Sequence, residues 1–198
     1  MAWFEWAAAI LTAVSVYLAA RENIWNWPTA IVSVAMYIVV YIRAGLFSDA
    51  GLQLFFLATS VYGWYHWQHG GTDRSELPVS RTSARTWMWC AVFGVVFWYL
   101  DASITSRING VAFPYIDAAT TTVSLVAQWM MTRKLLENWI LWILVNVVYV
   151  PVLVVKGLYP TAALYSVLLV LAIKGLRDWH RSYTRHRDVA PHPAPTPA

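Results

Sequence analysis

Apolar residues along this chain occur in long runs, and short polar or charged clusters separate them. An α-helix needs about 20 predominantly apolar residues to cross the hydrocarbon core of a lipid bilayer. Seven runs come close to this length: 3–20, 26–42, 49–67, 86–104, 115–132, 137–155 and 158–176. The pattern therefore predicts an all-α integral membrane protein with seven transmembrane helices.

The composition supports a membrane location. Apolar residues make up 59% of the 198 residues and charged residues 12%, about half the charged share of a typical soluble domain. The net charge of +4 comes from basic residues that flank the apolar runs, so we expect a lipid bilayer and no nucleic acid as partner. The first run has no Lys or Arg ahead of it, and we expect it to remain as a helix rather than to be cleaved as a signal peptide.

Residues that could support metal or disulfide chemistry are few. Cys90 is the single cysteine, so the chain contains no internal disulfide. The five histidines, at positions 66, 69, 180, 186 and 192, lie at the end of the third run or in the C-terminal tail, which argues against a buried histidine metal centre. No acid, base and nucleophile stand close together. We therefore expect no metal, no cofactor and no enzymatic activity.

Basic residues are distributed unevenly between the two sides that seven crossings define. One side holds Arg43, Arg107 and Lys156, and the other holds eleven: Arg21, Arg74, Arg81, Arg85, Arg133, Lys134, Lys174, Arg177, Arg181, Arg185 and Arg187. Cytoplasmic loops of membrane proteins are enriched in Lys and Arg. The N-terminus is therefore expected outside and the C-terminus in the cytoplasm, with a cytoplasmic loop at 68–85 and a disordered cytoplasmic tail at 180–198.

The chain contains an internal repeat. Residues 21–67 align without a gap with residues 133–179, and about a quarter of the aligned positions are identical. The identical pairs include Asn26 and Asn138, Trp27 and Trp139, Tyr37 and Tyr149, Gly63 and Gly175, and Trp67 and Trp179. Such self-similarity is typical of a protein built from two copies of one unit.

The repeat and the orientation together predict an architecture. The three helices of residues 1–67 correspond to those of residues 111–179 and both sets begin outside, so an odd number of helices has to join them. The linker segment 86–110 supplies one helix, which gives a 3+1+3 arrangement of parallel repeats. Repeat-built transporters bind their substrate near the midplane between the two units. A transporter is therefore favoured over a duplicated helical bundle without a transport role.

A polar and aromatic stripe on the sixth run points to a binding site. Trp139, Trp142, Asn146 and Tyr149 follow one another at spacings of 3, 4 and 3 and share one helix face. Asn146 lies about 10 Å along the helix from its interfacial end, where an amide costs free energy unless it faces protein or a cavity. The alternative is an interfacial Trp139 and an Asn146 that bonds to a neighbouring helix. The combined stripe favours a site.

The fifth run carries a second stripe with spacings of 4, 3 and 4, formed by Asp117, Thr121, Ser124 and Gln128. Hydroxyl groups can bond to their own helix, whereas the amide of Gln128 needs a partner elsewhere. Further polar positions in the first half are Ser33, Tyr37, Tyr41 and Gln53. Amides and hydroxyls beside tryptophans suit a neutral or weakly cationic molecule that contains a ring.

The charges that are missing narrow the substrate further. No Lys or Arg lies in the middle third of any run, so an anionic substrate such as a nucleotide would lack a counter-charge. Asp101 and Asp117 lie toward the outer ends of their runs, which gives little support to ion coupling. Passive transport fits best, with net uptake set by metabolism inside the cell. Pro28 and Pro151 could be hinges or static kinks.

Several spaced motifs together resemble the PnuC family of vitamin transporters. They are Asn26-Trp27-Pro28, residues 46–53, residues 62–67, Trp139-x-x-Trp142-x-x-x-Asn146 and Lys156-Gly157-Leu158-Tyr159. The resemblance covers all seven runs and implies a homotrimer whose architecture is related to the SWEET sugar transporters. It also implies facilitated diffusion of nicotinamide riboside, thiamine or riboflavin across the bacterial inner membrane, followed by trapping through cytoplasmic phosphorylation.

The resemblance also selects site residues. Trp139, Trp142 and Asn146 carry the motif of the nicotinamide riboside members, and Gln128 and Gln53 are carried over with them. Shared helix faces add five candidates: Trp27, Tyr37, Thr121, Ser124 and Tyr149. Nicotinamide riboside and thiamine both contain a cationic aromatic ring, which tryptophans bind well. Nicotinamide riboside is thus favoured by one motif, with thiamine, riboflavin or a sugar as alternatives.

Overall fold

The structure, a computed structural model, describes residues 2–43, 47–107 and 113–189. Over these residues the chain forms seven α-helices and one short 3-10 turn, Thr72–Arg74. The helices are α1 (Ala2–Ala20), α2 (Asn26–Arg43), α3 (Phe47–His69), α4 (Ala84–Thr105), α5 (Pro114–Thr132), α6 (Asn138–Val155) and α7 (Tyr159–Val189). Each of the seven apolar runs is therefore a helix, as the pattern predicts.

The helices differ in how apolar they are. Four of them, α1, α4, α6 and α7, are long and apolar enough to cross a membrane by length and composition. The polar candidates of the first half and of the fifth run lie on the other three, with Gln53 on α3 and Gln128 on α5. Polar side chains lower the mean hydropathy of a helix, and a membrane helix accommodates them by facing them toward protein or a water-filled cavity.

Several helix ends follow from local backbone chemistry. Pro28 stands in the first turn of α2, where a backbone N–H has no helical acceptor to lose. α6 ends at Val155, and Gly157 follows with a φ of +73° that suits a glycine after a helix end. The N–H of Leu158 there donates to the carbonyl oxygen of Leu153 at 2.9 Å. Pro151 lies inside α6 and removes one backbone hydrogen bond there.

The C-terminal helix is longer than the apolar run predicts. α7 continues to Val189, so the expected disorder is wrong for residues 180–189. Trp179 is fully buried, and Tyr183 packs against the same hydrophobic core. These contacts hold the polar continuation of the helix against the bundle. Residues 190–198 lie outside the described part of the chain.

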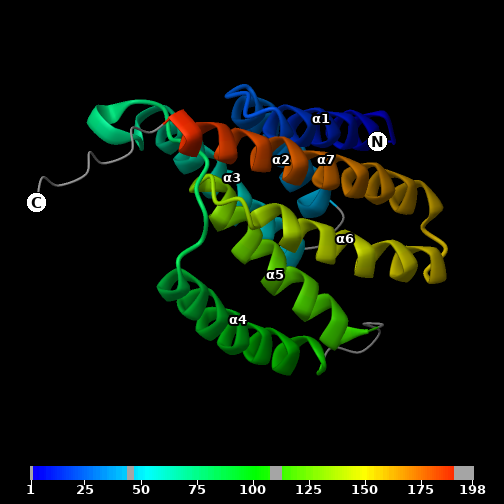
Figure 1. The fold of residues 1–198 in the computed structure, drawn as a ribbon. Coiled ribbons are helices and arrows are strands. Elements are labelled where there is room, and N and C mark those ends of the chain that lie inside the picture. Colours follow the sequence, from blue (N-terminus) through cyan, green and yellow to red (C-terminus); the bar gives the residue numbers. More distant parts are fainter. Residues whose placement is uncertain (1, 44–46, 108–112, 190–198) are drawn as a thin grey trace, which may run out of the picture.

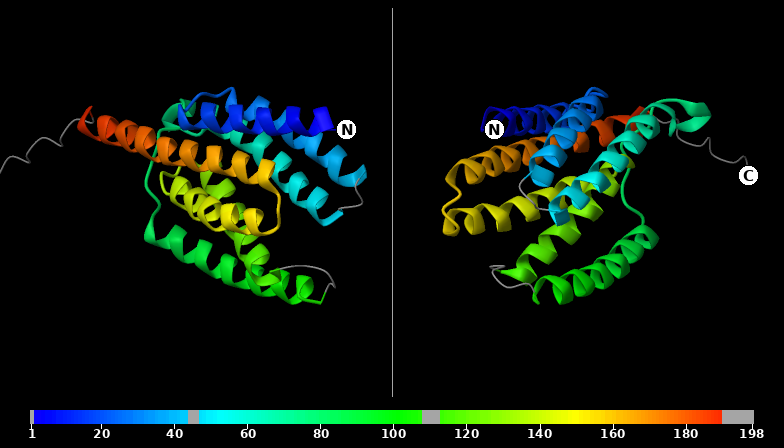
Figure 2. Two further views of the ribbon diagram at one scale, coloured as in Figure 1. Left: turned by 90° about the vertical axis from the view of Figure 1, so that its right-hand side faces the viewer. Right: turned by 180° about the vertical axis from the view of Figure 1, so that it is seen from behind.

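The helices form two groups. α2 contacts both α1 and α3, and α6 contacts both α5 and α7 (Figure 1). The groups meet where α1 contacts α7 and where α3 contacts α5. α4 packs against α5 at the edge of the bundle, apart from the other helices in every view (Figure 1 and Figure 2). The space between the two groups is thus bordered by six helices and not by α4.

The sequence repeat is also a repeat of contacts. The indole Nε1 of Trp67 donates to the carbonyl oxygen of Met131, and the Nε1 of Trp179 donates to that of Ala19, both at 3.0 Å. Trp67 and Trp179 are 112 positions apart, and so are Ala19 and Met131. Each half of the molecule therefore holds the other through the same pair of positions.

Four tryptophans, Trp27, Trp67, Trp139 and Trp179, form an aromatic layer at one end of the bundle, which we call the tryptophan layer. Within each half the rings meet edge to face, with centroid distances of 5.2 Å and 5.4 Å, a favourable aromatic geometry. Trp67 and Trp179 meet across the halves at 5.7 Å. None of the four is more than 2% exposed, so the bundle is tightly closed at this end.

Candidate functional site

A cavity of about 810 Å³ lies between the two groups of helices. This volume is within the range of small-molecule sites, about 300 to 1,000 Å³. Its lining residues are exposed at one end, where Glu5 and Asp49 stand, and buried at the other, where the cavity meets Trp27 and Trp139. We call the exposed end the mouth and the buried end the floor. The cavity is therefore closed at the tryptophan layer.

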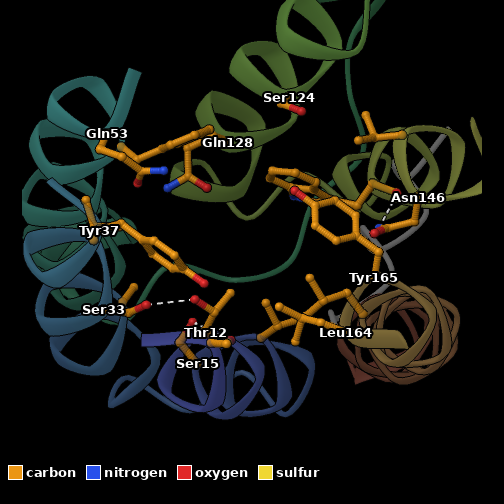
Figure 3. A pocket seen from close by; sticks show the side chains of 18 of the residues that line it. Thr12, Ser15, Ser33, Tyr37, Gln53, Ser124, Gln128, Asn146, Leu164 and Tyr165 are labelled. Carbon is orange, nitrogen blue, oxygen red and sulfur yellow. Dashed lines mark hydrogen bonds between the residues drawn. The ribbon is translucent and has the colours of Figure 1, made fainter. Parts of the chain in front are cut away.

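All ten candidate residues line this cavity: Trp27, Tyr37, Gln53, Thr121, Ser124, Gln128, Trp139, Trp142, Asn146 and Tyr149. They come from α2, α3, α5 and α6, and α1 and α7 complete the wall. Figure 3 shows the side chains of Tyr37, Gln53, Gln128 and Asn146 around the open space. The fold thus brings the helix-face candidates and the motif residues to one place.

Four side-chain amides line the cavity, and three of them, those of Gln53, Gln128 and Asn146, are sequence candidates that differ in their hydrogen bonding. Asn146 is 3% exposed, and its Nδ2 donates to the carbonyl oxygen of Trp142 in its own helix at 2.7 Å (Figure 3). This bond is not to a neighbouring helix, and it leaves the Oδ1 of Asn146 as an acceptor. Gln53 and Gln128 are half-buried. Their side chains form no hydrogen bond with the residues that the structure describes, so both amides are available to a ligand.

The hydroxyl groups are more fully occupied than the amides. Ser124 donates to the carbonyl oxygen of Thr120 at 2.7 Å, as expected for a hydroxyl that its own helix satisfies. Thr12 and Ser33 share a hydrogen bond of 2.7 Å that joins α1 to α2 (Figure 3). Ligand recognition in the cavity therefore depends more on the amides than on these hydroxyls.

The sequence reasoning missed lining residues on α1 and α7. Thr12 and Ser15 line the cavity from α1, and Tyr165 lines it from α7 (Figure 3). Thr12 and Ser15 lie three positions apart on one face of a mostly apolar run, which was the available signal. Tyr165 is the repeat equivalent of Gln53, 112 positions away. Mapping each candidate onto its equivalent in the other half would have found it.

Trp139 and Trp27 form the floor rather than the open wall. A Cβ atom added to Gly175 would lie 2.6 Å from the ring of Trp139, and one added to Gly63 would lie 2.4 Å from the ring of Trp27. Each indole thus packs directly on a helix backbone. Trp142 also lines the cavity but is only half-buried. The two tryptophans of the motif therefore have different surroundings.

The charges around the cavity favour cations over anions. Among the described residues, its lining includes the carboxylates of Glu5 and Asp49 and no Lys, Arg or His. Lys156 pairs with Asp117 at 3.6 Å. A cleft lined by charges of one sign attracts ligands of the opposite sign. The described residues also contain no group of three His, Cys, Asp or Glu that could hold a metal ion.

Comparison with known proteins identifies the family of the chain. Residues 2–181 match the family described as nicotinamide mononucleotide transporter. The chain belongs to the nicotinamide mononucleotide transporter family. Its curated relatives include the nicotinamide riboside transporter PnuC of Escherichia coli K12, which is 27% identical over 92% of this chain and 87% of its own length.

Two further proteins resemble the chain to a similar degree. The riboflavin/roseoflavin transporter RibM of Streptomyces davaonensis is 26% identical over 89% of this chain and 84% of its own length. A crystal structure of the vitamin B3 transporter PnuC shares the fold, with a TM-score of 0.73 at 24% identity over 93% of this chain and 83% of that one. These findings confirm the resemblance to PnuC and identify a membrane transporter family, not an enzyme.

Proposed function

We propose that this protein takes up nicotinamide riboside by facilitated diffusion. The observation that carries the proposal is the cavity lining, which combines tryptophans, four amides and two carboxylates without a basic residue among its described members. Nicotinamide riboside has a cationic pyridinium ring, a carboxamide and a neutral ribose, so its charge and polar groups suit this lining. A mononucleotide suits it less well, because its phosphate would meet no counter-charge.

The motif residues have separable roles in this proposal. The indole of Trp142 stacks on the pyridinium ring, an arrangement that a cationic ring strengthens. The Oδ1 of Asn146 accepts a hydrogen bond from the carboxamide NH₂ group, because its Nδ2 is already bonded to Trp142. The unpaired amides of Gln53 and Gln128 are left for the ribose hydroxyls. The remaining candidates, Trp27, Tyr37, Thr121, Ser124, Trp139 and Tyr149, shape the cavity around the ligand.

The proposed mechanism is alternating access by two parallel repeats. In this view the first three helices and the last three are the moving units, α4 is the linker, and the arrangement is the SWEET-related 3+1+3 fold. The reciprocal hydrogen bonds of Trp67 and Trp179 support such units, since they join the halves through equivalent positions. Rocking of one unit against the other exposes the cavity at alternate ends. A homotrimer of such units is part of the proposal.

The proposed orientation follows from the basic residues. It places the N-terminus and the cavity mouth outside, and the tryptophan layer on the cytoplasmic side. The substrate then enters from outside, crosses the bacterial inner membrane down its gradient, and is trapped by phosphorylation in the cytoplasm. Coupling to an ion is not required, because no carboxylate lines the floor of the cavity among the described residues.

Riboflavin is the second candidate, because a riboflavin/roseoflavin transporter is among the curated relatives. Riboflavin is neutral and carries a larger ring system than nicotinamide riboside. It would use the tryptophans and amides but gain little from Glu5 and Asp49. Thiamine is cationic, like nicotinamide riboside, and is distinguished from it by the amide contacts alone.

The deciding experiment is a titration of the purified protein in detergent, followed by the fluorescence of its 13 tryptophans. We expect saturable quenching by nicotinamide riboside and a weaker response to the mononucleotide. Uptake into liposomes should be unaffected by proton or sodium gradients. A saturable response to riboflavin or thiamine alone would favour that vitamin. No response to nicotinamide riboside, riboflavin or thiamine would refute vitamin transport.

A further inference from the structure

The connection between α3 and α4 is held against the bundle at several points. The backbone N–H of Leu77 donates to the carbonyl oxygen of Trp67 at 2.9 Å. Ser80 pairs with Leu135 in a parallel β-bridge, with hydrogen bonds of 3.1 Å to Lys134 and 2.9 Å from Leu136. We call residues 77–82 the strap. It is bonded to α3 in the first half and to the α5–α6 turn in the second half.

A single buried carboxylate fastens the end of the strap. Glu137 is 6% exposed, and its Oε2 accepts hydrogen bonds from the backbone N–H of Thr82 at 2.9 Å and from its hydroxyl at 2.7 Å. Its Oε1 accepts one from the Nε of Arg81 at 3.1 Å. Hydrogen bonds to a carboxylate are stronger than those between neutral groups. Through these hydrogen bonds, Glu137 joins the α5–α6 turn to the strap.

The strap covers the outer side of the tryptophan layer. Val79 is 4% exposed and belongs to the same buried cluster as Trp67, Trp139 and Trp179. The other side of this cluster is the floor of the cavity, where Trp139 and Met131 line it. A solute that leaves the cavity by this end has to pass the layer, and the layer cannot part while the strap joins its two halves.

The layer itself contains unsatisfied groups. The Nε1 atoms of Trp27 and Trp139 are buried and have no hydrogen-bond partner among the described residues. A buried donor without a partner costs free energy that exposure to water would recover. These two residues are repeat equivalents, so both halves of the closed layer carry the same cost. The closed state thus depends on other contacts to hold it, and those of the strap are among them.

We infer that the strap is a release latch, which holds the tryptophan layer shut until residues 80–82 leave the α5–α6 turn during each transport cycle. Its first part stays with α3, because residues 70–76 connect it directly to that helix. The contacts that break are those of Ser80 and Thr82 with a turn 55 positions away. This inference rests on the proposed transport function.

The test is a reversible tether across the β-bridge. Paired strands lie about 4.8 Å apart, which a disulfide can span, so Ser80→Cys with Leu135→Cys in a Cys90→Ala background should crosslink on oxidation. We expect nicotinamide riboside to quench the oxidised protein as before, while uptake into liposomes falls at least tenfold and returns on reduction. The matched control is Ser83→Cys with Thr86→Cys, a pair in contact within the start of α4, whose oxidation should leave uptake unchanged.

The outcomes separate the latch from the transported substrate. Uptake that is equally fast in the oxidised and reduced tether would overturn the latch, whichever vitamin is carried. A second measurement needs no substrate. Met131 is 6% exposed, and the thiol of a Met131→Cys variant should react faster with a water-soluble reagent when Glu137→Gln is added. Equal reactivity with and without Glu137→Gln would count against the latch, whereas absence of all vitamin binding would count only against the proposed substrate.

Discussion

Glu22 and Lys134 are equivalent positions of the repeat, and they bind each other: the Nζ of Lys134 lies 3.4 Å from the Oε2 of Glu22. Equivalent positions can meet only where the two halves come together around a common axis. Both residues have a left-handed backbone, with φ of 55° and 49°, just beyond the ends of α1 and α5. Glycine is common at such helix ends because a side chain is strained there. Here the ion pair between Glu22 and Lys134 explains why charged side chains stand at these positions instead of glycine.

We expect the Glu22→Ala variant to be less stable, because it leaves the buried Lys134 side chain, 7% exposed, without its partner. Breaking a fully buried pair costs about 3 to 5 kcal/mol, and the partial exposure of Glu22 reduces this to roughly 1 to 3 kcal/mol. The exchange of both charges, Glu22→Lys with Lys134→Glu, should recover most of the loss. Thermal unfolding in detergent measures both. An exchange variant no more stable than Glu22→Ala would show that the two positions are not interchangeable.

Gly63→Ala and Gly175→Ala should each destabilise the protein. The added methyl groups would lie 2.4 Å from Trp27 and 2.6 Å from Trp139, and overpacking of this kind costs about 1 to 3 kcal/mol. Gly51→Ala is the matched control, since nothing lies within 4 Å of its Cβ position and alanine favours the helix by up to about 1 kcal/mol. The melting temperature should fall for the first two and not for the third. Equal effects at all three sites would argue against the tryptophan packing.

Most of the fold could be predicted because a bilayer leaves the backbone few choices. Each membrane segment has to satisfy its own hydrogen bonds, so a long apolar run is a helix. The polar end of α7 follows no such rule. It is helical because Trp179 and Tyr183 pack on residues far away in the sequence, which a local pattern does not contain.

The residues that line the site could be predicted from the sequence, but how deeply each is buried could not. Helix periodicity placed Trp139 and Trp142 on one face, and both line the cavity. It could not show that Trp139 is 1% exposed and packed on Gly175 and Trp179, because that depends on where α7 lies. Nor could it show how the strap is held, because its contacts with the α5–α6 turn join residues 55 positions apart.

Asn146→Ala and Gln128→Ala should each weaken binding of nicotinamide riboside about five- to 150-fold, since a polar group left unpaired costs about 1 to 3 kcal/mol. Tryptophan fluorescence measures the change. Val147→Ala is the control, because this neighbour of Asn146 is 52% exposed and does not line the cavity. Unchanged affinity in both amide variants would remove these amides from the site.

The stability of the protein should depend on Glu137 at acid pH. Burial raises the pKa of Glu137, but hydrogen bonds from the side chain and backbone of Thr82 and from Arg81 outweigh it and hold the pKa below its usual range. A lowered carboxyl pKa stabilises the fold fully above the ordinary value of about 4.3, and this stabilisation is lost as the pH falls through the folded pKa. The melting temperatures of the parent and of Glu137→Gln should therefore differ most near neutral pH and converge below about pH 4. A gap that stays constant from pH 7 to the acid range would contradict this role.

The charge of Asp49 at the cavity mouth should distinguish cationic from neutral substrates. Asp49 lines the cavity and is exposed, so Asp49→Asn should weaken binding of nicotinamide riboside and thiamine by about two- to fivefold, the effect of an exposed charge of roughly 0.5 to 1 kcal/mol. The loss should shrink in high salt, which screens exposed charges, and riboflavin binding should not change. Asp101→Asn is the control, because Asp101 does not line the cavity. Equal losses for riboflavin and nicotinamide riboside would mean that Asp49 supports the shape of the mouth and not its charge selectivity.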